Sequence, residues 1–149
     1  MEAVILVGLQ ASGKSSFCRE RFFRTHVRIN LDMLRTRHRE RRLLEVCVET
    51  RTPFVVDNTN PAVADREPYV RAAKAAGFRV ACYFFESRVE DCVRRNAGRP
   101  PAERVPEVGV RGTRSRLAIP RRHEGFDEMW FVRLAGPGEF LVDEWRDEI

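Results

Sequence analysis

Eight residues near the N-terminus have the types and spacing of a phosphate-binding loop. The stretch Gly8-Leu9-Gln10-Ala11-Ser12-Gly13-Lys14-Ser15 fits G-x-x-x-x-G-K-[ST] without a mismatch. Gly8 and Gly13 would let the backbone turn tightly, so that successive N–H groups point at the β-phosphate of a nucleotide. Lys14 would reach the β- and γ-oxygens, and the Ser15 hydroxyl would ligate Mg²⁺. This stretch therefore predicts the binding of a nucleoside phosphate.

Two further groups that could do chemistry follow a short apolar run at residues 27–30. Asp32 and Arg35 are three residues apart, so a helical turn would project both the same way, toward the phosphate loop. A carboxylate there can accept a proton from an attacking hydroxyl, and a guanidinium can bind a phosphate of the acceptor through two N–H groups. The alternative is that Asp32 is a helix N-cap and Arg35 a surface side chain.

A third polar cluster, Asp57-Asn58-Thr59-Asn60-Pro61, follows the apolar residues 53–56. An acidic residue at the end of a buried strand in a phosphate-loop protein usually holds Mg²⁺ or its water shell. Asn60 before Pro61 predicts the start of a helix, with Asn60 as its N-cap. This structural role leaves Asp57 as a candidate metal ligand and Thr59 as a candidate acceptor contact.

The elements that must position these groups alternate between strand and helix. The phosphate loop is preceded by the apolar residues 3–7 and followed by residues 14–24, which lack Gly and Pro. This context favours a true phosphate loop over a chance match in a glycine-bearing turn. Strands are predicted at residues 3–7, 27–30, 53–56, 78–85 and 129–132. Such alternation predicts an α/β fold with a central parallel five-stranded sheet covered on both faces, and a site at the carboxyl ends of the strands.

The segments beyond the fourth strand are less regular. Ser87-Arg88-Val89-Glu90 is predicted to be a capping box that opens a helix carrying Arg94, Arg95 and Arg99. Residues 100–125 contain prolines, glycines and arginines with weak apolar periodicity, which is typical of a mobile lid. The tail after Gly138 is expected to dock on the body of the protein.

A basic helix face lies next to the proposed site. Arg35, Arg39 and Arg42 share one face, which could follow a nucleic-acid backbone. Glu40, Glu45 and Glu49 on the same segment fit ordinary solvated ion pairs equally well. Both interpretations stay open at this point.

Composition limits the classes of protein that the chain can belong to. A length of 149 residues suits one domain, and the formal charge of +5 favours an anionic partner. The four cysteines have no paired spacing of a zinc site or redox motif, so they are expected to be reduced thiols of a cytoplasmic protein. No stretch resembles a signal peptide or a membrane span, and we expect a soluble protein without a membrane partner.

Together these motifs resemble the kinase domain of the polynucleotide 5′-kinases, the bacteriophage enzyme and, more closely, the kinase half of animal polynucleotide kinase phosphatases. The matching strings, in the same order, are residues 8–15, Asn30-Leu31-Asp32-Met33-Leu34-Arg35, Val56-Asp57-Asn58-Thr59-Asn60-Pro61, Arg95-Asn96-Ala97-Gly98-Arg99, Val105-Pro106 and Glu124-Gly125-Phe126. The phosphate loop alone would identify only a superfamily, whereas the D-N-T-N-P and E-G-F strings beside D-x-x-R are more specific.

The resemblance implies a fold and an activity. It implies one three-layer P-loop kinase domain over residues 1–149, with a lid at about residues 95–125. The implied activity is transfer of the γ-phosphate of ATP or GTP, with Mg²⁺, to the 5′-OH end of DNA or RNA, as in nucleic acid repair. Two alternatives remain: a P-loop kinase of a small hydroxylated metabolite such as a nucleoside, sugar or antibiotic, and a nucleotide-binding regulatory module without transfer.

The resemblance also implies roles for single residues. Asp32 would be the general base, Arg35 would hold the 3′-phosphate of the acceptor, Arg99 would stabilise the transferring phosphoryl group, and Arg95 would contact the donor. For Arg99 the alternative is a solvated helix terminus. The expected catalytic residues are Lys14, Asp32, Arg35 and Arg99; the nucleotide contacts Gly8, Ala11, Ser12, Gly13, Lys14, Ser15, Ser16, Arg95 and Arg99; the acceptor contacts Asp32, Arg35 and Thr59; and the metal ligands Ser15 and Asp57.

Overall fold

A computed structural model describes residues 1–146 and contains one six-stranded sheet. The strands are β1 (Glu2–Val7), β2 (Val27–Ile29), β3 (Phe54–Val56), β4 (Arg79–Phe85), β5 (Glu128–Gly136) and β6 (Glu139–Glu144). Their order is β2-β3-β1-β4-β5-β6, and the first five run parallel. The predicted α/β fold is thus confirmed.

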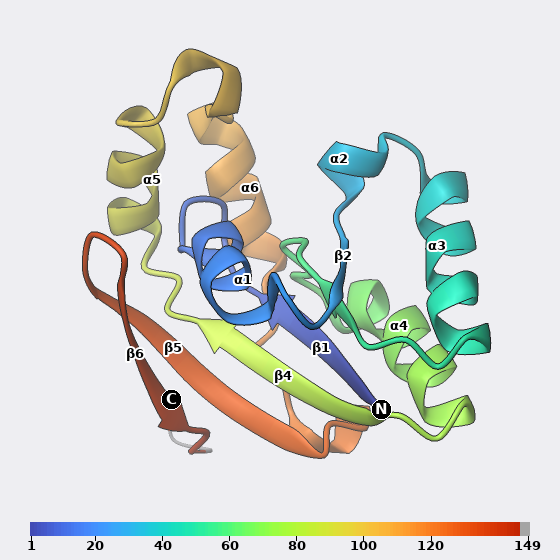
Figure 1. The fold of residues 1–149 in the computed structure, drawn as a ribbon. Helices are drawn as coiled ribbons and strands as arrows, with labels where there is room; N and C mark the ends of the chain where they lie inside the picture. Colours follow the sequence, from blue (N-terminus) through green and yellow to red (C-terminus); the bar gives the residue numbers. More distant parts are fainter. Residues whose placement is uncertain (147–149) are drawn as a thin grey trace.

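Helices cover both faces of the sheet and also extend beyond its carboxyl edge (Figure 1). They are α1 (Lys14–Phe22), α2 (Leu31–Leu34), α3 (Arg37–Glu49), α4 (Val63–Ala75), α5 (Val89–Ala97) and α6 (Glu107–Arg116), with single 3₁₀ turns at Pro101–Glu103 and Arg122–Glu124. Of three core clusters, one contains residues of α1 and another contains residues of α3 and α4, so the sheet lies between two helical layers. Helices α5 and α6 rise on one side of the phosphate loop, and α2 and α3 rise on the other.

The strand that leads into the phosphate loop is buried on both faces. In β1, residues 3–7 are fully buried because β3 and β4 flank the strand and helices cover it above and below. Phe17 of α1 packs on one face against Tyr83 and Phe85 of β4. This packing explains why the sequence of β1 is a continuous apolar run rather than an alternating one.

All four cysteines are buried and unpaired. Burial raises the pKa of the Cys18 thiol to about 11 and also raises that of Cys47, Cys82 and Cys92. The thiols are therefore protonated at neutral pH, because the charged thiolate is poorly solvated in these positions.

The prediction of a five-stranded, fully parallel sheet was wrong in one respect. The tail forms a sixth strand, β6, which pairs antiparallel with β5 through a turn at Gly138, where φ is 73°. Phe140 packs edge-on against Phe17 at a centroid distance of 5.2 Å. The short alternation of Phe140 and Val142 with polar residues is that of a half-buried edge strand, which gives a weaker sequence signal than a buried one.

Two helices also differ from the sequence-based expectation. The irregular segment 100–125 contains the helix α6, whose buried residues are only Val110 and Thr113, so its apolar periodicity is weak. Helix α4 begins at Val63 rather than at Pro61. Asn60 is not its N-cap: it has φ 47°, is buried, and donates its side-chain amide to the carbonyl of Leu6 at 2.8 Å.

Within residues 1–146, none of the helices is both long and apolar enough to cross a bilayer.

Candidate active site

The phosphate loop has the backbone geometry that its glycines allow. Gly13 caps α1 with φ 102°, and Ala11 also has a positive φ of 63°. A Cβ atom at Gly8 would lie 2.8 Å from Ser12 Oγ and 2.9 Å from Phe85 Cβ. Glycine is therefore required at Gly8 by close packing and at Gly13 by its left-handed conformation.

The loop is held by residues from two other strand ends. The amide of Gly8 donates to the carbonyl of Thr59 at 3.0 Å, and the amide of Leu9 donates to Ser87 Oγ at 3.1 Å. Ser87 was predicted to open a capping box, which was wrong, because the N-cap of α5 is Arg88 and makes no side-chain capping bond within the described residues. Ser87 instead anchors the loop and donates its own hydroxyl to Phe85 O.

Lys14 is buried at the centre of the loop. Its Nζ donates to the carbonyls of Gly8 at 2.9 Å and Leu9 at 2.6 Å, and it lies 3.4 Å from Ser12 Oγ. Burial lowers the pKa of Lys14 to about 8; the negative charge of Asp57 opposes this effect, and the nearby charge of Arg99 adds to it. The ammonium group is thus poorly compensated by charge, which favours a negatively charged ligand.

Asp57 and Ser15 form a pair that fits a magnesium ion. Ser15 Oγ donates to Asp57 Oδ2 at 3.0 Å, and Arg28 Nε donates to the same oxygen at 2.8 Å. Asp57 is only 2% exposed, and its second oxygen, Oδ1, is buried without a hydrogen-bond partner among residues 1–146. One hydroxyl and one carboxylate oxygen beside a phosphate loop are the oxygen ligands that Mg²⁺ takes in such proteins.

Asp32 lies on a helix of a single turn, α2, directly after β2. Asn30 caps this turn by accepting from Met33 N at 2.8 Å, and donates its own amide to the carbonyl of Asp57 at 2.6 Å. The turn ends before Arg35, which has φ 74°, so the expectation that one helical turn carries both Asp32 and Arg35 was wrong. The reason is the positive φ, which redirects the chain before α3 begins.

The two arginines near the end of α5 occupy different places. Arg95 Nη1 donates to the carbonyl of Ala11 in the phosphate loop. Arg99 lies just beyond the helix, 3.5 Å from the carbonyl of Glu103, and its charge contributes to lowering the pKa of Lys14. Arg99 and Lys14 both line the same cleft.

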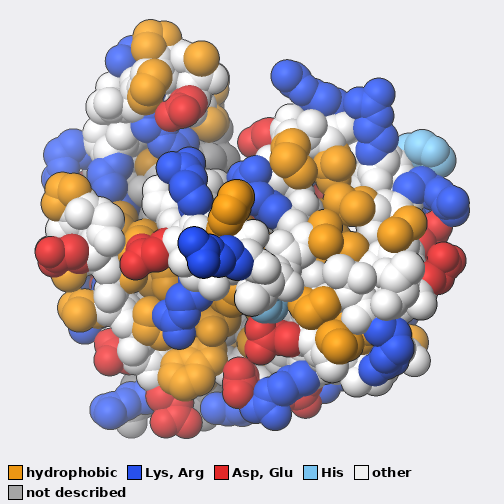
Figure 2. All heavy atoms as spheres, in the orientation of Figure 1, with side chains coloured by type: hydrophobic (Ala, Val, Ile, Leu, Met, Phe, Trp, Pro, Cys, Tyr) orange, Lys and Arg blue, Asp and Glu red, His pale blue; other side chains and the backbone are white. Residues whose placement is uncertain are grey.

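A cleft of about 760 Å³ brings most of these groups together. Figure 2 shows the molecule hollowed between the α5–α6 side and the α2–α3 side, with Lys and Arg side chains on both rims. Of the expected residues, those lining the cleft are Ala11, Lys14, Ser15, Asp32, Asp57, Thr59 and Arg99; those outside the lining, as far as residues 1–146 show, are Gly8, Ser12, Gly13, Ser16, Arg35 and Arg95. Gly8, Ser12 and Gly13 belong to the phosphate loop but do not line the cleft, whereas Ser16 and Arg35 are exposed to solvent.

The sequence did not identify several residues that line this cleft or contact its lining residues. Arg28 contacts Asp57, Gln10 donates to Thr113 of α6 at 3.0 Å, and Arg41 and Arg116 line opposite walls. Only Arg28 had a usable signal: it is two residues before Asn30, so a strand would carry both side chains on one face. The others reach the cleft through tertiary packing, which no local pattern specifies.

Comparison with known proteins identifies relatives for most of the chain. A bifunctional polynucleotide phosphatase/kinase of Schizosaccharomyces pombe is 27% identical over 129 residues, which are 84% of this chain and 32% of that protein. The chain thus spans about a third of the length of this curated relative. This similarity supports the resemblance to polynucleotide kinases that the motifs indicated.

Solved structures with the same fold include a gluconokinase from Sinorhizobium meliloti 1021, with TM-score 0.64 and 20% identity over 92% of this chain and 85% of that one. Kti12 of Chaetomium thermophilum, in complex with ADP-AlF3, has TM-score 0.71 and 14% identity over 89% of both chains. At these identities the likeness extends to the fold alone, which is that of P-loop kinases. The family model described as AAA domain, AAA_33, matches residues 4–119, and the chain therefore belongs to this family of P-loop proteins.

Proposed function

We propose that this protein is an NTP-dependent phosphotransferase that transfers the γ-phosphoryl group of ATP or GTP to the 5′-OH end of a polynucleotide. The observation that carries the proposal is that one cleft is lined by Lys14, Asp32 and Arg99. A phosphate cradle, a carboxylate and an arginine around one space are the parts that phosphoryl transfer requires. The polynucleotide acceptor is supported by the motif strings and by the name of the curated relative.

In this proposal each group has one task. The loop amides and Lys14 bind the phosphates of the donor, and Arg95 and Arg99 complete its contacts. Asp32 accepts the proton of the attacking hydroxyl as the new oxygen–phosphorus bond forms and the bond to the leaving diphosphate breaks. Ser15 and Asp57 would hold Mg²⁺, which neutralises charge on the β- and γ-phosphates when bound. Arg99 stabilises the charge of the transferring group.

The acceptor would enter from the α3 side of the cleft. Arg37 and Arg41 of α3 line this wall, together with Thr59 and Asp32. Arg37 is paired with Glu40 at 2.8 Å, whereas none of the described residues forms an ion pair with Arg41 within 4.0 Å. A cationic wall of this kind suits an acceptor that carries phosphates. Arg35 would have to turn toward the cleft to hold the 3′-phosphate.

We also propose that residues at about 95–125, which include the end of α5 and all of α6, act as the lid, within a single kinase domain over residues 1–149. The lid wall of the cleft includes Arg99, Glu103, Val105 and Arg116. Closure of such a segment would bring Arg99 onto the γ-phosphate and exclude water from it.

The deciding experiment is a transfer assay with γ-labelled ATP or GTP, Mg²⁺, and DNA or RNA oligonucleotides that carry either a 5′-OH or a 5′-phosphate. We expect label on the 5′-OH strands only, loss of transfer in Asp32→Ala, and a rate at subsaturating strand that falls steeply with salt. A panel of nucleosides and sugars tests the metabolite alternative. Transfer to one of these but to no strand would replace the proposed acceptor, and tight nucleotide binding without any transfer would indicate a regulatory module.

A further inference from the structure

The short helix that carries Asp32 has little stability of its own. A helix of four residues makes too few internal hydrogen bonds to offset the cost of its nucleation. Two side chains from outside α2 satisfy two of its free N–H groups: Asn30 accepts from Met33 N at 2.8 Å, and Asn58 Oδ1 accepts from Leu31 N at 2.9 Å. Asn58 follows Asp57 directly, so the turn with Asp32 is tied to the segment with the proposed metal ligand.

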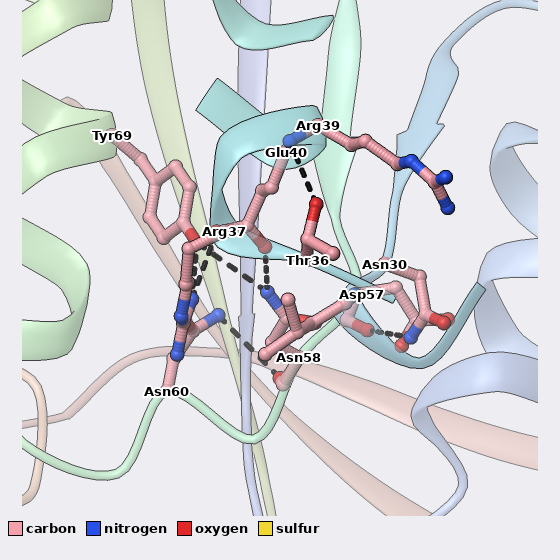
Figure 3. A network of polar contacts seen from close by, with 10 residues as sticks. Asn30, Thr36, Arg37, Arg39, Glu40, Asp57, Asn58, Asn60 and Tyr69 are labelled. Atoms are coloured by element: carbon pink, nitrogen blue, oxygen red, sulfur yellow. Dashed lines mark hydrogen bonds and ion pairs between the residues drawn. The ribbon is translucent and has the colours of Figure 1, made fainter. Parts of the chain in front are cut away.

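Asn58 can support α2 only if its amide is oriented correctly. The oxygen must face Leu31, which leaves the NH₂ group to face the other way. There Asn58 Nδ2 donates to Glu40 Oε2 at 2.9 Å and lies 3.4 Å from the hydroxyl of Tyr69 (Figure 3). The partner of the NH₂ group therefore determines which way the amide points.

Glu40 supplies that partner because it is a buried acceptor surrounded by donors. The residue is 4% exposed, and its Oε1 accepts from the Tyr69 hydroxyl at 2.7 Å and from Arg37 Nη1 at 2.8 Å. An ionised carboxylate has no hydrogen to donate, so the Asn58 oxygen cannot face it without a loss of hydrogen bonding. Tyr69 comes from α4 and Glu40 from α3, so the network joins both helices to the loop after β3.

We infer that Glu40 is a positioning residue for phosphoryl transfer: by fixing the amide of Asn58, it holds the one-turn helix that presents Asp32 to the acceptor hydroxyl. The inference rests on the proposed function for the role of Asp32. Glu40 acts only through Asn58, because the hydrogen bond to α2 is the one that Asn58 Oδ1 accepts from Leu31 N.

Three substitutions should weaken the hydrogen bonding between Glu40 and Asn58 to different degrees. Glu40→Leu removes both acceptors, so Asn58 is free to rotate and Leu31 N loses its partner. Glu40→Gln keeps one acceptor oxygen, which can still serve Asn58, and gives an intermediate state. Tyr69→Phe leaves Glu40 Oε2 on Asn58 and has the smallest effect. Glu45→Gln is the matched control, because Glu45 lies on the same helix but pairs with the exposed Arg42 at 2.6 Å.

The first measurement is amide hydrogen exchange at Leu31, with the sheet amide of Asp57, which donates to Ile29 O, as the internal reference. We expect exchange at Leu31 to be at least ~10-fold faster in Glu40→Leu, intermediate in Glu40→Gln, and unchanged in Glu45→Gln, because the amide has lost a fixed acceptor. Unchanged exchange at Leu31 in both Glu40 variants would overturn the inference. If Glu40→Leu does not fold, Glu40→Gln decides the matter alone.

The second measurement separates positioning from a general structural role. We expect kcat to fall ~10- to 100-fold in Glu40→Leu while the KM for nucleotide stays constant, because a displaced base lowers the rate without changing donor binding. In an Asp32→Ala background the same substitution should have almost no further effect on the rate. An equal loss in both backgrounds would contradict the inference. Absence of transfer by the unmodified protein would instead reject the proposed function, and amide exchange would then test the Glu40–Asn58–Leu31 connection by itself.

Discussion

At the scale of single residues, the buried Lys14 predicts a proton uptake when nucleotide binds. Its pKa is lowered from 10.5 to about 8 in the ligand-free protein, mainly by burial. Phosphates around Nζ favour the charged form and raise this pKa, so at pH 8.5 the complex holds more protons than the separate partners. The uptake should be absent well below pH 8, where Lys14 is charged in both states.

This proton uptake can be measured by titration calorimetry with Mg-nucleotide in buffers of different ionisation enthalpy. Measurements at pH 7, 8 and 9 should show an uptake that grows with pH. A release of protons, or no dependence on the buffer at pH 9, would contradict the proposed contact between Lys14 and the phosphates.

Arg99 gives a second prediction at the residue scale. Its side chain lines the cleft and makes one long hydrogen bond within residues 1–146, to Glu103 O at 3.5 Å, so truncation of this side chain should cost little stability. An arginine placed beside the transferring phosphoryl group acts mainly on the charge distribution of the transition state, so Arg99→Ala should lower kcat by ~10³-fold while the dissociation constant for nucleotide changes much less. Single-turnover kinetics and nucleotide titration would measure the two effects. An equal loss in both would assign Arg99 to ground-state binding.

At the scale of elements, the phosphate loop depends on the ends of β3 and β4 as much as on its own motif. Ser87 accepts the amide of Leu9, a fully buried residue. Ser87→Ala leaves that N–H group without a partner, so we expect the free energy of unfolding to fall by about 1–3 kcal/mol and nucleotide binding to weaken. Denaturant unfolding and nucleotide titration would test this. Ser115→Ala, on the exposed side of α6, is the control and should be nearly neutral in both.

The sequence predicted the elements whose signal is local. Residues 8–15 and the five parallel strands could be placed because their motif and their apolar runs lie within short windows. The strand β6 and the helix α6 could not, because each buries only part of one face. Ser87 and Asn60 were given capping roles because both residue types favour helix starts, whereas each one bonds the strand and loop around residues 6–9.

The same limit applies to the candidate site. The residues that line the cleft from the motif strings could be named in advance, since their chemistry is visible in their types. Glu40 resembled one of several surface carboxylates on a basic helix, and only the packing of α3 on α4 buries it beside Tyr69. Such positions are decided by contacts between distant segments, which a single sequence does not encode as a pattern.

At the scale of the whole molecule, one buried arginine connects three distant segments. Arg66 of α4 is fully buried, pairs with Glu124 at 2.8 Å, and donates to the carbonyls of Asn60 and Ala118. Arg66→Met would leave Glu124 buried and uncompensated, so we expect a loss of about 3–5 kcal/mol in the free energy of unfolding. Arg71→Met, which breaks an exposed pair with Glu67, should change it by less than about 1 kcal/mol. Similar losses in the two variants would contradict this reading of Arg66.

Because all four thiols are buried, the folded protein should react little with thiol reagents, so a cysteine introduced at the surface can be labelled selectively. Maleimide should label almost none of the four cysteines in the folded protein and all four in denaturant, as mass spectrometry would show. A pair of reporter groups attached through Ser115→Cys on α6 and His38→Cys on α3, both exposed positions, would then act as a spectroscopic ruler across the cleft. The distance between the two dyes, followed as nucleotide is added, would turn closure into a directly observed motion.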